Sequence, residues 1–240
     1  MKSNMSSEVK THNLPACVIL CGGKGERLRP LTQETPKPLV HLEGRPILSY
    51  LMDHLKKFPL GTVIAAAGFQ AEKIQNFFQG HFLEMQVQVV DSGEADILQR
   101  ILACAHHISG DFLVLYGDTL ADVDLAKLQA FHRAHGAPAS MCVWPMQSPF
   151  GVVDLDPQGT VTRFREKPRL ESWINIGNFY FARGNLDRMA RHATFVEFLQ
   201  TLAANGHLRA FQHRGSHITI NTLLDLEQAR NEIHLFGSRR

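Results

Sequence analysis

The sequence predicts an α/β fold in which a mostly parallel central sheet is flanked by helices on both faces. Short apolar runs alternate with amphipathic segments over the first half of the chain, and several of these runs end in glycine or aspartate. Such alternation predicts right-handed crossovers, which leave successive strands parallel. Farther along, strand-like segments separated by short turns predict a smaller β lobe inserted into this α/β unit.

The first expected strand is Ala16 to Leu20, because a short apolar run that ends in glycines is typical of a buried central strand. The segment from Ile47 to Phe58 has apolar residues at the spacing of one helical face. Further strands are expected at Thr62–Ala67, Met85–Val90 and Phe112–Leu115, and further helices at Ala71–Phe78, Asp96–His107 and Leu125–His135.

The alternation weakens after residue 135. Strands are expected there at Ala139–Pro145, Val152–Leu155, Val161–Phe164, Ile176–Ala182 and Leu208–Gln212, and helices at Phe195–Ala204 and Leu223–His234. We therefore expect one domain over 15–240, after a flexible polar segment at 1–14. Its parts are a first α/β part over 15–136, the inserted lobe over 137–215 and a closing helix over 216–240.

Composition excludes several classes of protein. The chain has 240 residues with 44% hydrophobic content, and 25 Lys and Arg against 23 Asp and Glu give a net charge of +2, so no nucleic-acid partner is expected. Its four cysteines contain no CxxC pair, which favours a reducing cytosol. The polar N-terminus lacks an apolar signal region, and the longest apolar run, Val63–Ala67, cannot span a bilayer. A cytoplasmic protein without a membrane partner is expected.

Histidine is frequent, with thirteen residues, and two pairs are close in sequence. His132 and His135 lie three apart on an expected helix, and His213 and His217 lie four apart. Neither pair comes with the third and fourth ligands that a zinc site needs. We expect no histidine metal site.

The loop after the first strand carries glycines and cations together. The glycines are Gly22, Gly23 and Gly25, and the cations are Lys24, Arg27 and, after Pro36, Lys37. Glycines permit a tight turn whose N–H groups face an anion, and the cations can neutralise a polyphosphate. The expected ligand is a nucleoside triphosphate.

Two common phosphate loops do not fit this segment. The dinucleotide fingerprint GxGxxG, started at Gly23, would need a glycine where the chain has Leu28, and GxxxxGK[ST] has no match. Neither a dehydrogenase nor a P-loop ATPase is therefore indicated.

The run from Val18 to Pro38, VILCGGKGERLRPLTQETPKP, resembles the signature G-G-x-G-[ST]-R-L-x-P-L-T-x-x-x-P-K-P of the sugar-1-phosphate nucleotidylyltransferases. It departs at Glu26, where the family usually has a small hydroxyl residue. The resemblance implies a Rossmann-like sheet, a triphosphate bound by Arg27 and Lys37, and a base packed on the main chain near Leu20. The implied nucleotide contacts are Leu20, Gly22, Gly23, Lys24, Gly25, Arg27, Lys37, Gly93 and Gly117.

An acidic residue, Asp118, follows the expected strand Phe112–Leu115 in the sequence Tyr116-Gly117-Asp118-Thr119. Read alone, it could cap a helix or a turn. It also resembles the family's G-D aspartate, which implies that it holds Mg²⁺ between the triphosphate and the sugar phosphate. Magnesium needs only one or two carboxylates besides substrate phosphates, so one acid is sufficient.

Later motifs follow in the family's order. They are Phe150-Gly151, Phe164-Arg165-Glu166-Lys167-Pro168 and Asn175-Ile176-Gly177. The resemblance implies that Glu166 contacts sugar hydroxyls, that Lys167 contacts the sugar phosphate, and that Asn175 begins a sugar-binding turn. The implied sugar-phosphate contacts are Gly151, Glu166, Lys167, Asn175 and Gly177.

Near the last expected helix the chain has Asn221, where many members have a second metal-binding aspartate. An amide oxygen can also bind Mg²⁺, and bacterial N-acetylglucosamine-1-phosphate uridylyltransferases are similar in using asparagine. We take Asp118 and Asn221 as the expected magnesium ligands. The alternative is that Asn221 is only the helix N-cap, a role that asparagine also favours.

The resemblance implies an enzyme that transfers a nucleoside monophosphate from an NTP to a sugar 1-phosphate, with Arg27, Lys37, Asp118 and Lys167 as its catalytic group. CTP is the first choice, because Val89–Gly93 and Arg100–Leu102 resemble glucose-1-phosphate cytidylyltransferases; GTP, dTTP and UTP remain open. The alternatives are a non-sugar phosphate acceptor, or a catalytically silent nucleotide-binding relative. A homo-oligomer is compatible with the sequence.

Overall fold

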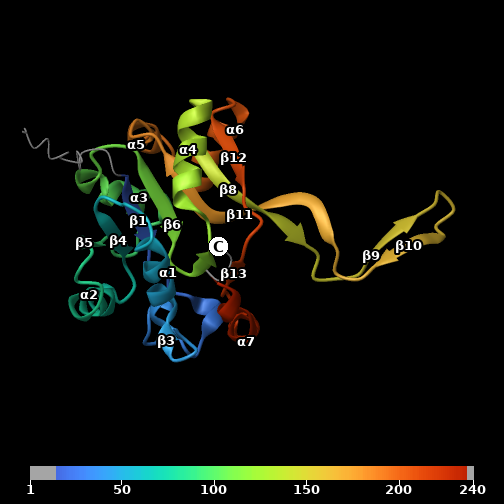
Figure 1. Cartoon of the computed structure of the whole chain (residues 1–240), viewed down its shortest axis with the longest axis horizontal. Helices are drawn as coiled ribbons and strands as arrows, with labels where there is room; N and C mark the ends of the chain where they lie inside the picture. Colours follow the sequence, from blue (N-terminus) through green and yellow to red (C-terminus); the bar gives the residue numbers. More distant parts are fainter. Residues whose placement is uncertain (1–14, 237–240) are drawn as a thin grey trace, which may run out of the picture.

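The computed structural model describes residues 15–236 and is built on one seven-stranded sheet (Figure 1). In spatial order the strands are β12 (Leu208–Gln212), β8 (Ala139–Gln147), β11 (Arg169–Phe181), β6 (Phe112–Tyr116), β1 (Ala16–Leu20), β4 (Val63–Ala67) and β5 (Val87–Asp91). Parallel pairs join β1 to β4 and β6, β4 to β5, and β12 to β8. Only β11 runs antiparallel to its neighbours, so the predicted mostly parallel sheet is confirmed.

The helices cover both faces of this sheet. They are α1 (Ile47–Leu55), α2 (Ala71–Gly80), α3 (Ile97–Ala103), α4 (Leu125–His135), α5 (Asn185–Met189), α6 (Phe195–Ala204) and α7 (Leu223–Glu232). Successive side chains of a strand point to opposite faces. Accordingly, Cys17 and Ile19 of β1 enter one buried core, and Ala16 and Val18 enter the other. Apolar side chains on both faces explain the unbroken apolar runs of the central strands.

Local signals explain where several helices begin. The side chains of Asp96, Asp124, Thr194 and Thr222 each accept a hydrogen bond from a backbone N–H in the first turn of the helix that follows. Each cap satisfies a donor that has no partner inside the helix. The helices α4 and α6 have the predicted bounds, whereas the expected helix from Ile47 ends at Leu55 instead of Phe58.

The segment 137–215, expected as an inserted lobe, contributes β8, β11 and β12 to the main sheet. Only β9 (Val152–Leu155) and β10 (Val161–Arg165) leave it, as an antiparallel pair that projects from the body (Figure 1). We call residues 148–168 the hairpin. Strand pairing joins residues distant in sequence, so strand-like patterns alone do not reveal which sheet a strand enters.

Short elements complete the fold. Two small strand pairs are β2 (His41–Leu42) with β3 (Arg45–Pro46), and β7 (Thr119–Ala121) with β13 (His217–Thr219). Single 3₁₀ turns occur at η2 (Glu26–Leu28), η3 (Lys37–Leu39), η4 (Ala105–His107) and η5 (Ile233–Leu235). Within residues 15–236, no helix has the length and apolar character needed to cross a membrane. The flexible segment expected at 1–14 lies outside the described residues.

Candidate functional site

The loops that follow β1 and β6 lie against each other at the carboxyl edge of the sheet. Leu20 pairs with Tyr116 in the parallel register, and the N–H of Gly117 donates to the carbonyl of Leu20 at 3.1 Å. A Cβ atom at Gly117 would lie 2.8 Å from that carbonyl oxygen and 3.1 Å from Cys21 Sγ. Only glycine permits this approach. It brings Asp118 to the glycine-rich loop.

The glycine-rich loop folds back on itself to position Lys37. Gly25 has φ of 61°, a left-handed conformation, and its carbonyl accepts a 2.7 Å hydrogen bond from Thr32 Oγ1. A Cβ atom at Gly25 would lie 3.1 Å from Cβ of Lys37. Lys37 begins the η3 turn directly after Pro36 and is only 8% exposed. Its ammonium group is therefore held by the fold and not free in solvent.

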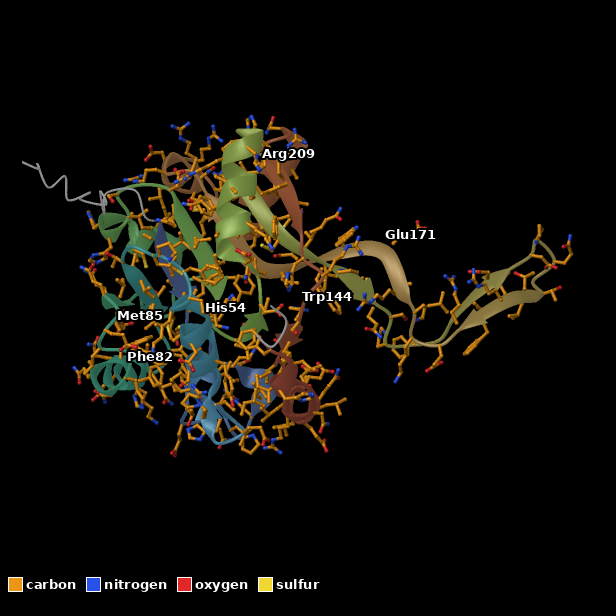
Figure 2. All side chains as sticks on the ribbon, viewed as in Figure 1. His54, Phe82, Met85, Trp144, Glu171 and Arg209 are labelled. Carbon is orange, nitrogen blue, oxygen red and sulfur yellow. The ribbon has the colours of Figure 1, made fainter. Side chains whose placement is uncertain are left out.

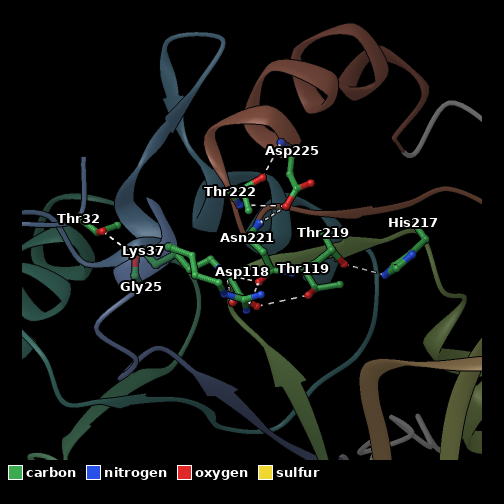
Figure 3. Close-up of polar contacts among 11 residues, drawn as sticks. Gly25, Thr32, Lys37, Asp118, Thr119, His217, Thr219, Asn221, Thr222 and Asp225 are labelled. Atoms are coloured by element: carbon green, nitrogen blue, oxygen red, sulfur yellow. Dashed lines mark hydrogen bonds and ion pairs between the residues drawn. The ribbon is translucent and has the colours of Figure 1, made fainter. Parts of the chain in front are cut away.

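Four predicted residues meet at one point, and Figure 3 shows three of them, Lys37, Asp118 and Asn221. Lys37 Nζ lies 2.5 Å from Asp118 Oδ2 and 2.9 Å from Asn221 Oδ1, and Arg27 donates to the same Asn221 oxygen at 3.2 Å. Arg27 and Asn221 are 194 positions apart in sequence. This polar cluster has two cations against one carboxylate, an arrangement that suits an anionic ligand.

The first turn of α7 shows that Asn221 is not its cap. Thr222 is the N-cap, and its hydroxyl accepts from the N–H of Asp225 at 3.2 Å. The Asp225 carboxylate accepts in return from the N–H groups of Asn221 and Thr222, both at 2.9 Å (Figure 3). The helix-cap interpretation of Asn221 is therefore wrong, because the capping box leaves its side chain free to face Lys37.

The donor set of the cluster fits a magnesium ion. A carboxylate oxygen of Asp118 and an amide oxygen of Asn221 converge on the ammonium of Lys37, so both oxygens already face a single cation. Hard oxygen donors of this kind are the ones that Mg²⁺ takes. Among residues 15–236, no three His, Cys, Asp or Glu side chains gather in a metal-binding group. An ion here would need water or phosphate oxygens to complete its shell.

The loop after β5 lies across from the glycine-rich loop. Lys24 forms a 2.6 Å ion pair with Glu94, and both side chains are largely exposed. Gly93 has φ of 60°, and its N–H donates to the Asp91 carboxylate at 2.9 Å. A Cβ atom at Gly23 would meet no atom within 4 Å, so this backbone is open to a ligand. An exposed ion pair therefore joins the two loops that carry the predicted nucleotide contacts Gly23 and Gly93.

Arg100 is a buried residue of this region whose role the sequence did not reveal. Its guanidinium donates to the carbonyl of Ala67 at 2.6 Å, to Ser92 Oγ at 3.0 Å and to the carbonyl of Ala95 at 2.5 Å. A Cβ atom at Gly22 would lie 1.6 Å from this guanidinium. Arg100 therefore holds the loop after β5 against the glycine-rich loop. In the sequence, Arg100 is a charge among the apolar residues of α3 and part of the segment Arg100–Leu102 that resembles glucose-1-phosphate cytidylyltransferases, and neither feature indicates this bracing role.

The predicted sugar-binding turn packs beside the strand that carries Asp118. Gly177 has φ of 73°, and its N–H donates to Asn175 Oδ1 at 2.9 Å. A Cβ atom at Gly177 would lie 2.5 Å from Cγ of Tyr116. The register of β11 with β8 shifts between Asn175 and Phe179. This irregularity turns the backbone toward the end of β6, where the predicted chemistry lies.

The remaining predicted residues lie at the root of the hairpin. A Cβ atom at Gly151 would lie 2.7 Å from the Phe164 ring and 3.1 Å from Glu166 Oε2. Lys167 has φ of 43°, which costs a non-glycine residue on the order of 1–2 kcal/mol. Lys167 and Thr219 line a cavity of about 810 Å³, whereas Glu166 and Gly151 do not line it. None of the four residues of the polar cluster lines this cavity.

Other titratable groups near the site are structural. Burial raises the pKa of the Cys21 thiol, so this residue stays protonated and is no nucleophile. His132 Nδ1 and His135 Nε2 both contact Ser140 Oγ, at 2.9 and 3.0 Å. His213 contacts the Asp122 carboxylate at 3.0 Å. These histidines hold the fold together away from the polar cluster.

Comparison with known proteins gives consistent matches. Residues 16–216 match the nucleotidyl transferase family. Glucose-1-phosphate cytidylyltransferase of Salmonella typhi is 32% identical over 236 residues, covering 87% of this chain and 91% of that protein. The catalytic subunit beta of mannose-1-phosphate guanylyltransferase of Drosophila melanogaster is 34% identical over 190 residues, covering 75% of this chain and 52% of that protein.

Solved structures share the fold at lower identity. HddC from Yersinia pseudotuberculosis superposes with a TM-score of 0.73 at 23% identity, covering 92% of this chain and 100% of that one. A putative glucose-1-phosphate thymidylyltransferase from Bacillus anthracis has a TM-score of 0.72 at 19% identity, covering 90% of this chain and 94% of that one. With the family match spanning most of its length, the chain belongs to the nucleotidyl transferase family.

Proposed function

We propose that the chain transfers the nucleoside monophosphate of an NTP to a sugar 1-phosphate and releases pyrophosphate. The observation that carries this function is the meeting of Arg27, Lys37, Asp118 and Asn221 beside an open glycine-rich backbone. A silent relative would be expected to lose the metal acid or the basic pair, and this chain keeps both in contact. Four free, buried cysteines fit the reducing cytoplasm as its compartment.

The proposed reaction is an in-line displacement. An oxygen of the acceptor phosphate forms a bond to the α-phosphorus, and the bond from that phosphorus to the bridging oxygen breaks. The electron pair leaves with pyrophosphate. Catalysis of this kind depends on positioning and charge neutralisation, so no nucleophilic side chain is needed.

The cluster has hydrogen-bond donors to spare for phosphate. The ammonium of Lys37 has three N–H groups, of which Asp118 and Asn221 take two, leaving one for a phosphate oxygen. Arg27 uses one of five N–H groups on Asn221. Both cations can therefore stabilise the leaving pyrophosphate. A magnesium ion on Asp118 and Asn221, when bound, would neutralise charge on the phosphates of both substrates.

CTP is the proposed nucleotide, supported by similarity to glucose-1-phosphate cytidylyltransferase over 87% of the chain. The test is a pyrophosphate-release screen of ATP, CTP, GTP, UTP and dTTP against sugar 1-phosphates, with phosphocholine as the non-sugar acceptor. Turnover is expected with a sugar 1-phosphate and to be highest with CTP. Pyrophosphate release with phosphocholine but with no sugar 1-phosphate would establish the alternative acceptor. Nucleotide binding without any pyrophosphate release would establish the silent relative.

Lys167 is proposed to bind the acceptor phosphate and not the NTP, because it lines the cavity at the hairpin root. Lys167→Ala should weaken acceptor binding about 10-fold or more, the effect of losing one charge-assisted hydrogen bond. Calorimetric titration with each substrate separately measures the effect. The control is Lys127→Ala, whose side chain is 77% exposed and pairs with Asp124 on α4. Equal losses of NTP and acceptor affinity would contradict this division of roles.

We infer that two copies associate through the hairpin. The cross-strand pairs Val153 with Phe164 and Leu155 with Val161 form one apolar face, and these side chains are 45–64% exposed. The ion pair of Arg165 with Asp154, at 2.8 Å, lies on the opposite face of the hairpin, because successive side chains of a strand alternate between faces. An isolated two-stranded hairpin is marginally stable in water. In a two-fold symmetric dimer, the same apolar face of each copy packs against that of the other. A second copy of the chain is also always present at equal concentration.

Phe164→Glu should weaken this association roughly 30-fold or more, because it places a charge in the apolar face. Sedimentation velocity over a concentration series measures the dissociation constant. Leu83→Glu, at a side chain that is 75% exposed outside the hairpin, is the control and should leave the mass unchanged. A monomeric wild-type protein at all concentrations would contradict the association.

A further inference from the structure

A cavity of about 810 Å³ lies at the hairpin root. One wall is β13, whose Thr219 pairs with Thr119, the neighbour of Asp118 (Figure 3). Another wall includes Trp144 of β8, which Figure 2 shows at the side of the body from which the hairpin leaves. Volumes of about 300–1,000 Å³ are typical of small-molecule sites, so a substituted sugar has room here.

Three cationic side chains line this cavity, namely Lys167, Arg169 and Arg214. In the part of the chain that the structure describes, none of them lies within 4 Å of a carboxylate oxygen. The two guanidinium groups instead lie over indole rings, Arg169 at 5.9 Å from Trp144 and Arg214 at 5.1 Å from Trp173. Stacking limits their rotation and leaves their N–H groups available.

The other charged or titratable groups of the lining do not neutralise these cations. Asp225 accepts from the N–H groups of Asn221 and Thr222, and Glu232 accepts from Gln228 at 2.8 Å, so both acids already have partners on or beside α7. Burial lowers the pKa of His217 to about 4, so its ring is neutral at pH 7. With three cations and two acids in its lining, the cavity has an excess of positive charge.

A single acceptor phosphate does not account for all three cations. Lys167 alone is matched to that phosphate, and arginine is the residue that binds a carboxylate or phosphate with two parallel hydrogen bonds. We propose that the acceptor carries a second anionic group, distant from its reacting phosphate, and that Arg169 and Arg214 bind it. This inference rests on the proposed function and names the chemical class of its acceptor.

The test compares three acceptors that differ in one substituent: glucose 1-phosphate, glucuronic acid 1-phosphate and glucose 1,6-bisphosphate. Calorimetric titration measures binding of each, and pyrophosphate release measures kcat/KM. We expect a preference of about 10-fold or more for at least one doubly anionic compound over glucose 1-phosphate. A preference for the uronic acid identifies a carboxylate as the second group, and a preference for the bisphosphate identifies a phosphate.

Arg169→Gln combined with Arg214→Gln should reduce this preference to about one. Arg209→Gln, an exposed arginine on β12 at another side of the body (Figure 2), is the control and should retain it. Equal binding of all three compounds to the wild-type protein, or a preference kept in the double variant, would overturn the inference. Pyrophosphate release without such a preference would leave the proposed function standing, whereas anion-selective binding without release would refute the function alone.

Discussion

Asp118→Asn is expected to lower turnover on the order of a thousandfold, even at high Mg²⁺. Asp118 is the one carboxylate of the polar cluster, and charge stabilisation by a bound metal contributes several kcal/mol to transfer reactions. Asparagine keeps the size of the side chain but cannot supply the anionic ligand. Steady-state pyrophosphate release across a magnesium titration measures the effect.

The matched variants act on the second proposed ligand. Asn221→Asp should keep activity and lower the magnesium concentration needed for half-maximal rate, because it adds a second carboxylate. Asn221→Ser should raise that concentration, since the shorter serine side chain cannot bring its hydroxyl oxygen to the position of the Asn221 amide oxygen. Thr222 caps α7 in both variants, so a thermal melt should show an intact fold. Identical magnesium curves for both variants and the wild-type protein would refute the role of Asn221 as a ligand.

Lys37→Met is expected to lower kcat by about a hundredfold or more. The substitution keeps an unbranched side chain in the 8% exposed position of Lys37 but removes the ammonium that we propose stabilises the leaving phosphate. Loss of one preorganised donor to developing charge typically costs about 10²–10³ in rate. The measurement is single-turnover pyrophosphate release at saturating NTP.

Two controls separate chemistry from folding in this experiment. Lys57→Met changes an exposed lysine after α1 and should retain full activity. A thermal melt of Lys37→Met is needed because the substitution also leaves Asp118 without its 2.5 Å partner. Wild-type turnover in a folded Lys37→Met protein would remove Lys37 from the site.

The sequence alone predicted the features that depend on neighbouring residues. The bounds of β1, β9, β12, α4 and α6 agree with the predicted ranges. The spacing of apolar residues and the capping residues determine these bounds, and both signals involve only residues a few positions apart. The placement of Asp118 beside the glycine-rich loop was also predictable. The carboxyl ends of parallel strands lie at one edge of a sheet, and β1 and β6 are neighbours in it.

Features that depend on distant contacts were decided only by the tertiary structure. Asn221 and Thr222 are both good capping residues, and only the approach of Lys37 and Arg27 shows which one faces the site. In the sequence, Arg100 is a charge on an apolar helix. Its role follows from its partners in the structure, which are backbone carbonyls of two other segments. Backbone carbonyls carry no sequence signal, so no pattern of side chains could have identified these partners.

The hairpin shows the same division. Its two strands were predicted as strand-like segments separated by a short turn, yet their projection and the entry of β8, β11 and β12 into the main sheet were not. A strand pattern specifies which side chains share a face, whereas its neighbours are chosen by pairing with residues far along the chain. The cavity that Lys167 shares with Arg169 and Arg214 exists only because those long-range pairings place the hairpin root beside β13.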